Sequence, residues 1–150
     1  MTKERLHHKL VTFQREILAL SGALVQERKA CQDTAEGMFL ELVTVLDAFE
    51  NVFASLADKE KEFDKAAQRG MKSFRAIHRK VMRLLEEQGV VKIEFAEGEA
   101  APMEFCCVVE TSEMAGWEEG AVLSIIKQGY RRGERVLRPA EVITVANAVR

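Results

Sequence analysis

The sequence GYRRGERVLRPAEVITVA, at residues 129–146, decides how the C-terminal part of the chain folds. The polar cluster at 131–134 interrupts the apolar pattern as a turn would. Pro139 lacks a backbone N–H and forces the residue before it out of the helical region, so it separates the apolar run at 136–137 from the run at 142–145. The stretch therefore predicts a small, tightly turned group of β-strands.

The segment before this stretch also has the period of β-strands. Apolar, β-prone runs occur at 90–95, 105–110 and 122–126, and polar loops divide them. Together with the final stretch, about five short strands are expected. We therefore predict a compact all-β domain over residues 90–150, called the β-domain.

The first part of the chain has a heptad pattern. Its apolar residues recur at alternating spacings of four and three residues, at Leu6, Leu10, Phe13, Ile17, Leu20 and Leu24. Such spacing places them on one stripe of a helix, which another helix must cover. A helix from Leu6 to Val45 would be ~60 Å long, too long for a compact monomer of this size. We therefore predict that residues 1–36 form a long dimerisation helix, paired in a parallel coiled coil with a second copy of the chain.

The middle of this helix is predicted to be its weak part. The heptad register continues through Glu27, Cys31, Thr34 and Met38. These residues make the stripe more polar, and Gly22 and Gly37 each cost about 1 kcal/mol in a helix interior. The first helix is therefore expected to end near Glu36.

Residues 37–89 carry two further apolar stripes, separated by a charged break at 57–62. Gly89 is expected to end the second of the two helices. The residues expected at the dimer interface are Leu42, Val45, Phe49, Phe74, Ile77 and Val81. Two helices cannot enclose a core alone, but two chains supply four, so this segment predicts a dimeric four-helix bundle. The fold class is accordingly α+β, with a long helix, a short-helix bundle and the β-domain.

The composition excludes several classes of function. The 22 basic and 24 acidic residues give a net charge of −2, which offers no general attraction to nucleic acid or to an anionic membrane. No apolar run approaches the roughly 20 residues of a membrane span, and no signal peptide is recognisable, so a cytoplasmic protein is expected. Cys31, Cys106 and Cys107 match neither a zinc spacing nor a disulfide framework, and neither a metal nor a cofactor is expected.

The sequence contains no recognisable set of catalytic residues. His7 and His8 are adjacent, so they point to different sides of a helix and cannot share a metal. His78 lies among basic residues without a nucleophile at a readable spacing. Asp47 and Glu50 are three residues apart on a helix, where such a pair usually forms a solvated edge. Because there is also no glycine-rich phosphate loop, we do not expect an enzyme or a nucleotide-binding protein.

Residues 129–146 resemble the C-terminal signature of the GrpE family, which has a Gly-Tyr pair, an arginine after a short loop and a Val-Leu-Arg-Pro-Ala run in this order. Residues 39–53 are similar to the short bundle helix of that family, and 70–89 to the helix before its β-domain. The family consists of nucleotide exchange factors of DnaK-type chaperones. The resemblance implies a homodimeric co-chaperone of the stress response that binds the ATPase domain of such a chaperone and accelerates ADP release.

The resemblance also implies a set of partner-binding residues. Carried over position by position, they are Asn51, Ala54, Gly70, Ile126, Arg135 and Val145. Asn51 and Ala54 stand where relatives usually have an arginine and an acidic residue, and Phe105 stands where they commonly have a histidine.

Two other functions fit parts of the pattern. The chain could be a coiled-coil adaptor or scaffold that dimerises and presents its β-domain to another protein. A nucleic-acid surface could be formed by the arginines at 131, 132, 135 and 138 and by the basic face of the second helix, at Lys72, Arg75, Arg79, Lys80 and Arg83. For the basic face the plain interpretation is solvation. For the four arginines it is a hydrated turn with arginine stems packed over Tyr130.

Overall fold

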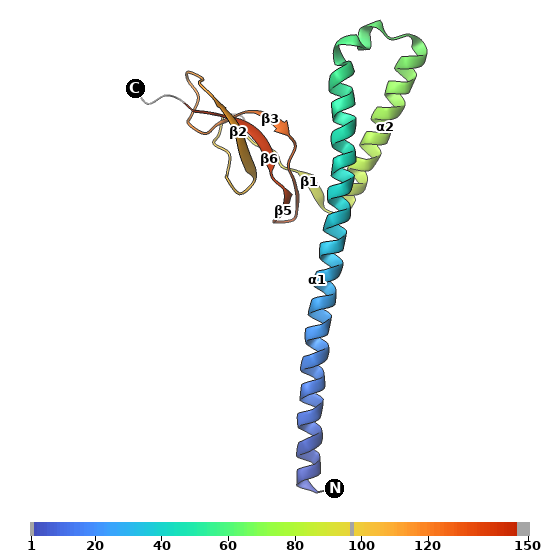
Figure 1. Ribbon diagram of the computed structural model, residues 1–150, viewed down its shortest axis with the longest axis vertical. Coiled ribbons are helices and arrows are strands. Elements are labelled where there is room, and N and C mark those ends of the chain that lie inside the picture. Colours follow the sequence, from blue (N-terminus) through green and yellow to red (C-terminus); the bar gives the residue numbers. More distant parts are fainter. Residues whose placement is uncertain (1, 97, 147–150) are drawn as a thin grey trace. The chain divides into compact units, whose positions relative to one another are not determined.

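The computed structural model describes residues 2–96 and 98–146 (Figure 1). The chain divides into two compact units, the first ending at Met38 and the second beginning at Phe39. The predicted division into residues 1–36, 37–89 and 90–150 is not tested by this partition and stays a prediction.

The first helix, α1, runs without a break over Lys3–Leu56, which is 54 residues. The prediction that it ends near Glu36 is therefore wrong, because Gly37 lies inside it. A single glycine costs about 1 kcal/mol but removes no backbone hydrogen bond, and its neighbours Met38 and Leu40 are helix formers. All six apolar residues of the predicted stripe from Leu6 to Leu24 are exposed in the single chain.

The second helix, α2 (Lys65–Glu87), follows a short 3-10 helix, η1 (Ala57–Glu62), at the predicted charged break. Asp64 caps its start, since Asp64 Oδ1 accepts the backbone N–H of Ala67 at 2.7 Å. After the cap residue Gln88, Gly89 takes φ +78, the left-handed conformation that ends many helices. Gly70, where the stretch 70–89 begins, lies inside this helix.

The core of the second unit lies where α1, α2 and the β-domain meet. Its fully buried side chains are Val43, Leu46, Leu85, Val90 and Tyr130, with Phe39, Val81, Met82 and Leu137 packed against them. Val43 and Leu46 lie beside the predicted dimer stripe of Leu42 and Val45, which remains exposed. The α1 segment from Phe39 onward and α2 are called the helix pair, and α1 presents one apolar face inward and another to solvent.

In the described residues the β-domain has six strands, against about five expected. They are β1 (Val90–Lys92), β2 (Cys106–Ser112), β3 (Val122–Lys127), β4 (Tyr130–Arg132), β5 (Arg135–Arg138) and β6 (Ala140–Val145). The strands form two three-stranded sheets, in the orders β1-β4-β5 and β2-β6-β3. The pair β2 and β6 is parallel, and the other pairs are antiparallel.

The additional strand is β4, which lies between β1 and β5. We had expected residues 131–134 to form a turn, but Arg131 and Arg132 belong to β4 and only Gly133 and Glu134 turn. Hydrogen bonding on both sides holds this short polar strand in place. As predicted, Pro139 separates β5 from β6.

Candidate partner-binding site

A cleft of ≈ 280 Å³ lies between α1 and the second sheet of the β-domain. Its lining residues are Asp47, Glu50 and Asn51 from α1, Ile126 and Lys127 from β3, Gln128 from the following linker and Glu141 from β6. The structure thus brings together Asn51 and Ile126, two of the residues predicted to bind a partner. Ile126 has 59% of its surface exposed, so it offers an apolar anchor beside polar neighbours.

The other predicted partner-binding residues do not line this cleft. Ala54 is exposed on α1, three residues after Asn51, and Arg135 is exposed at the start of β5. Gly70 is half-buried within α2, with open space around the position of a β-carbon. Val145 is only 1% exposed, so its side chain packs inside the β-domain and cannot act as the surface anchor that we expected.

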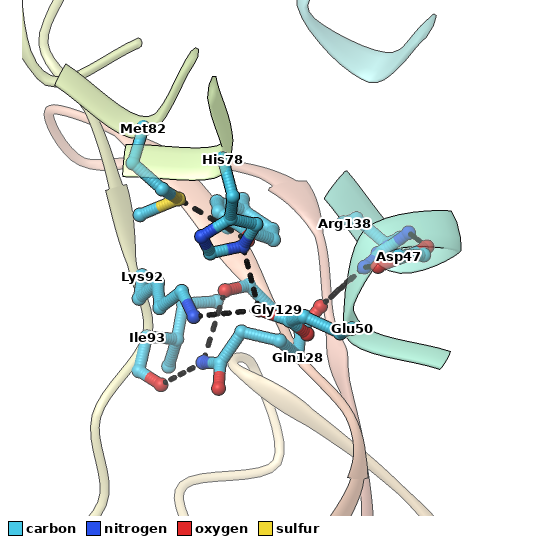
Figure 2. A network of polar contacts seen from close by, with 10 residues as sticks. Asp47, Glu50, His78, Met82, Lys92, Ile93, Gln128, Gly129 and Arg138 are labelled. Atoms are coloured by element: carbon cyan, nitrogen blue, oxygen red, sulfur yellow. Dashed lines mark hydrogen bonds and ion pairs between the residues drawn. The ribbon is translucent and has the colours of Figure 1, made fainter. Parts of the chain in front are cut away.

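Arg138 joins the β-domain to α1. Its Nη1 donates to Asp47 Oδ2 at 2.5 Å, and its Nη2 donates to Asp47 Oδ1 at 2.8 Å (Figure 2). The same guanidinium group donates to the Gln128 carbonyl oxygen from Nη2 at 2.6 Å and from Nε at 3.1 Å. The hydrogen bond with Asp47 raises the pKa of Arg138 above its ordinary value, so Arg138 is charged at every physiological pH.

Gln128 and Glu50 extend this polar network. Gln128 Nε2 donates to the Ile93 carbonyl oxygen at 2.7 Å. Lys92 Nζ donates to Glu50 Oε1 at 2.9 Å, and His78 Nε2 lies 3.6 Å from the same oxygen (Figure 2). The prediction that Asp47 and Glu50 form a solvated edge is therefore wrong, because both carboxylates face cations of the β-domain.

The side chain of His78 is packed against two aromatic rings of α1. The Phe53 ring lies edge-on to it at 5.6 Å between centroids, and the Phe49 ring lies at 6.2 Å. Its Nε2 is buried and makes no hydrogen bond within the described part of the chain. The nearest carboxylate, that of Glu50, is already bonded to Lys92.

The ring of Tyr130 packs against the guanidinium group of Arg138. Its ring is fully buried, and the Arg138 guanidinium lies over it with 5.6 Å from Cζ to the ring centroid. Its hydroxyl group lies 3.9 Å from the Met82 sulfur, a weak acceptor. Burial is the main cause that raises the pKa of the Tyr130 hydroxyl far above its ordinary value, so the group stays neutral.

The remaining arginines of the predicted turn have different surroundings. Arg131 Nη1 donates to the Gly133 carbonyl oxygen at 2.7 Å, within its own turn. Arg132 lies over the Phe39 ring at 5.1 Å and donates from Nε to the Gln88 carbonyl oxygen at 3.1 Å. Of the four arginines expected to pack over Tyr130, Arg138 does so.

The basic face of α2 borders a shallow hollow of ≈ 350 Å³, lined by Ala76, Arg79, Lys80, Arg83, Leu84 and Glu87. Arg75 from the same face makes a two-pronged ion pair with Glu60 of η1, at 2.6 and 2.7 Å. This hydrogen bond lowers the pKa of Glu60 below its ordinary value. Arg75 is therefore paired within its own chain.

Across residues 2–96 and 98–146, no three His, Cys, Asp or Glu side chains are grouped so that they could hold a metal. Within the same ranges no helix is long and apolar enough to cross a membrane. Gln128 and Glu141 also line the cleft, but the sequence did not identify them. Isolated polar residues near the ends of strands form no pattern that indicates a binding site.

Comparisons with known proteins agree on one family. The family model described as GrpE matches residues 3–146. The protein GrpE of Thermotoga petrophila is 34% identical over 119 residues, covering 78% of this chain and 62% of the relative. The protein GrpE of Geobacillus kaustophilus is 31% identical over 118 residues, covering 78% of this chain and 53% of the relative. The chain therefore spans between half and two thirds of the length of these relatives.

Proposed function

Because the chain belongs to the GrpE family, we propose that it is a co-chaperone and adenyl-nucleotide exchange factor that binds the ATPase domain of a DnaK-type chaperone and accelerates ADP release. The observation that carries this proposal is the family match, which runs through both helices and all six described strands. The exposed Ile126 beside Asn51 supports it, because a protein that works by binding needs such an anchor.

The proposed mechanism uses binding energy alone. The exchange factor grips the open form of the ATPase domain better than the closed form and so shifts the domain toward opening. Each tenfold acceleration of ADP release requires ~1.4 kcal/mol of differential contact, so a thousandfold requires ~4 kcal/mol. By linkage, bound nucleotide weakens the grip of the exchange factor by the same factor.

The proposed contact surface comprises the cleft and its surroundings. Ile126 is the apolar anchor, and Asn51 and Ala54 extend the surface along α1. Arg135 and Gly70 stay in the proposal as further contacts outside the cleft. Val145 supports the surface from within, because it packs in the strand β6 that pairs with β3.

We also propose that the protein is a homodimer. Leu6, Leu10, Phe13, Ile17, Leu20 and Leu24 are 48–70% exposed, and such an apolar stripe calls for a partner. Leu42, Val45, Phe74 and Ile77 are exposed on the helix pair, as a dimeric four-helix bundle requires. Val81 packs partly against the core of its own chain, and Phe49 contacts Phe74, so these two contribute less to the interface.

The test is the release of a fluorescent ADP analogue from the ATPase domain of a DnaK-type chaperone, followed by stopped flow. The protein should accelerate release without hydrolysing ATP, and a version without the β-domain should not. An unchanged release rate at saturating protein, with a chaperone shown to be active, would reject this function and leave the adaptor. The adaptor and the nucleic-acid surface also predict binding that ATP does not weaken, so a pull-down with and without ATP separates them.

A further inference from the structure

We propose that Arg138 is a positioning residue that fixes the orientation of the β-domain on the helix pair. The proposal rests on the exchange function proposed above, because it explains how the surface around Ile126 is presented. Arg138 is 17% exposed at its side chain and Asp47 is 20% exposed, so their ion pair is shielded from most of the solvent. A shielded, two-pronged pair has both strength and a defined direction.

Arg138 lies where the two sheets of the β-domain are joined. It ends β5 of the first sheet, and Pro139 leads directly into β6 of the second. Its other acceptor, the Gln128 carbonyl oxygen, lies on the linker from β3 of the second sheet to β4 of the first. The guanidinium group bonds to Asp47 of α1 and to Gln128 (Figure 2). It therefore connects α1 to two of the three crossings between the sheets, from β3 to β4 and from β5 to β6.

Among the described residues, the second sheet shares no buried cluster with the helices. The first sheet is anchored by packing, since Val90 and Tyr130 share a buried cluster with Val43, Leu46 and Leu85. The buried cluster of the second sheet consists of Cys106, Val122, Ala140 and Val142, with Phe95 and Ala101 packed against it. That cluster includes no residue of α1 or α2 among the described residues. The orientation of the second sheet on the helices is therefore set at the junction of the two sheets, where Arg138 bonds to α1.

The ion pair of Lys92 with Glu50 also connects the β-domain to α1, but it is weaker. Lys92 donates a single hydrogen bond to Glu50, and the two side chains are 32% and 36% exposed. Solvent screens such a pair, and the flexible lysine stem sets no direction. Moreover, Lys92 ends β1 and bonds to no residue of the linker from β3 to β4, whereas Arg138 bonds to Gln128 of that linker and is followed by Pro139 and then β6.

Orientation matters because the proposed contacts come from two separate elements. Ile126 belongs to β3 of the second sheet, and Asn51 and Ala54 belong to α1. While the ion pair of Arg138 with Asp47 is intact, these residues keep a fixed spacing. In the proposed function, this spacing matches the open ATPase domain better than the closed one. A loose β-domain would adapt to both forms, so it would still bind but would lose the preference that drives exchange.

The first test measures orientation in the full-length protein alone. Residual dipolar couplings report whether the β-domain and the helix pair share one alignment. In the wild type the two parts should fit a single alignment tensor, and in Arg138→Gln the couplings of the second sheet should shrink. Arg131→Gln is the matched control, because Arg131 bonds within its own turn. Unchanged couplings in Arg138→Gln would overturn the proposal, whatever the exchange assay gives.

A milder variant covers the case in which Arg138→Gln does not fold. Asp47→Asn keeps the shape of the side chain and leaves the bonds from Arg138 to Gln128 in place. Asp47→Asn should also reduce the residual dipolar couplings of the second sheet, as Arg138→Gln does. If a folded Asp47→Asn protein kept wild-type couplings, the ion pair of Arg138 with Asp47 would not be what orients the second sheet.

The second test measures the affinity for the DnaK-type ATPase domain without nucleotide and with saturating ADP. The ratio of the two affinities should fall about tenfold in Arg138→Gln, while the affinity for the ADP-bound domain changes less than threefold. Equal losses in both affinities would overturn the positioning role and indicate a direct contact or a stability effect. If the wild type itself binds the nucleotide-free and the ADP-bound domain equally well, the proposed exchange function fails. The dipolar couplings still decide whether Arg138 orients the second sheet.

Discussion

Gly129 lies against the backbone of Ala140 so closely that a β-carbon on Gly129 would be 2.5 Å from the Ala140 nitrogen. Gly129 is the last residue before β4, and Ala140 is the first residue of β6, so this contact is where the two sheets are joined. Backbone atoms cannot move aside as a flexible side chain can. The contact gives a physical reason for the glycine at the start of the stretch 129–146 and for the small residue after Pro139.

The first prediction follows from this contact. Gly129→Ala should lower the free energy of unfolding by ~1–3 kcal/mol, because the added methyl group forces the sheet junction apart. Gly70→Ala is the matched control, since Gly70 lies inside α2 with open space around its β-carbon position. That variant should gain roughly 0.5–1 kcal/mol. Urea denaturation measures both, and a Gly129→Ala protein as stable as the wild type would contradict the close contact.

Local signals explain which elements could be predicted from the sequence. Pro139 marks the boundary between β5 and β6, and Gly89 marks the end of α2, because each residue acts on its own backbone. Strand β4 gave no such signal, because it has only three residues and two of them, Arg131 and Arg132, are charged. Its neighbours β1 and β5 hold it in the sheet, and this is a tertiary effect that no local pattern carries.

Contacts distant in the sequence explain what could not be predicted. Asp47 and Arg138 are separated by 91 positions, and a carboxylate on a helix surface has the same local pattern whether it is solvated or paired. Val43 and Leu46 were missed for a related reason. The neighbouring stripe of Leu42 and Val45 already satisfied the helical period, so a second apolar face beside it did not stand out.

The second prediction concerns the arrangement of the proposed dimer. Cys31 is exposed and continues the heptad register of the stripe from Leu6 to Leu24. In a parallel, in-register pair the two Cys31 thiols would face each other across the seam, within reach of a disulfide. Mild oxidation should therefore produce a covalent dimer on a non-reducing gel. Light scattering of the reduced protein should give twice the monomer mass.

Two variants control this experiment. Cys31→Ser should abolish the covalent dimer, whereas Cys107→Ser should leave it unchanged. Ile17→Asp should weaken the association by placing a charge on the apolar stripe. A monomeric mass at micromolar concentration would exclude the dimer, and a dimer that Cys31 fails to cross-link would point to an antiparallel or staggered pair.

The third prediction concerns the reactivity of the cysteines. Cys106 is buried, and burial, reinforced by the neighbouring Cys107, raises the pKa of its thiol above the ordinary value. A raised pKa leaves less thiolate at a given pH, so Cys106 should react more slowly than Cys31 and Cys107, both of which are exposed. Its labelling rate should also keep rising with pH above the ordinary pKa of a cysteine thiol.

Labelling with a thiol reagent between pH 7 and 10, read by mass spectrometry of peptides, measures the three rates separately. In urea all three cysteines should react alike, because the difference comes from the fold. A Cys106 that reacts as fast as Cys107 in the folded protein would show that the loop before β2 opens readily.

The last prediction separates surface contacts from buried support in the proposed exchange activity. Ile126→Asp should abolish the acceleration of ADP release while leaving the melting temperature unchanged, because the side chain is 59% exposed in the single chain. Truncating an apolar anchor at an interface typically costs 2 kcal/mol or more, about thirtyfold in affinity. Arg135→Ala should cost much less, because exposed charges contribute little.

Val145→Asp supplies the contrast, since Val145 is 1% exposed. It should lower the melting temperature and the activity together, because an unpaired charge would be buried in the β-domain. Stopped-flow release of the fluorescent ADP analogue and thermal unfolding should be measured on the same samples. If Ile126→Asp kept its activity, the anchor would lie elsewhere on the β-domain. If it lost stability as Val145→Asp does, its loss of activity would report folding rather than contact.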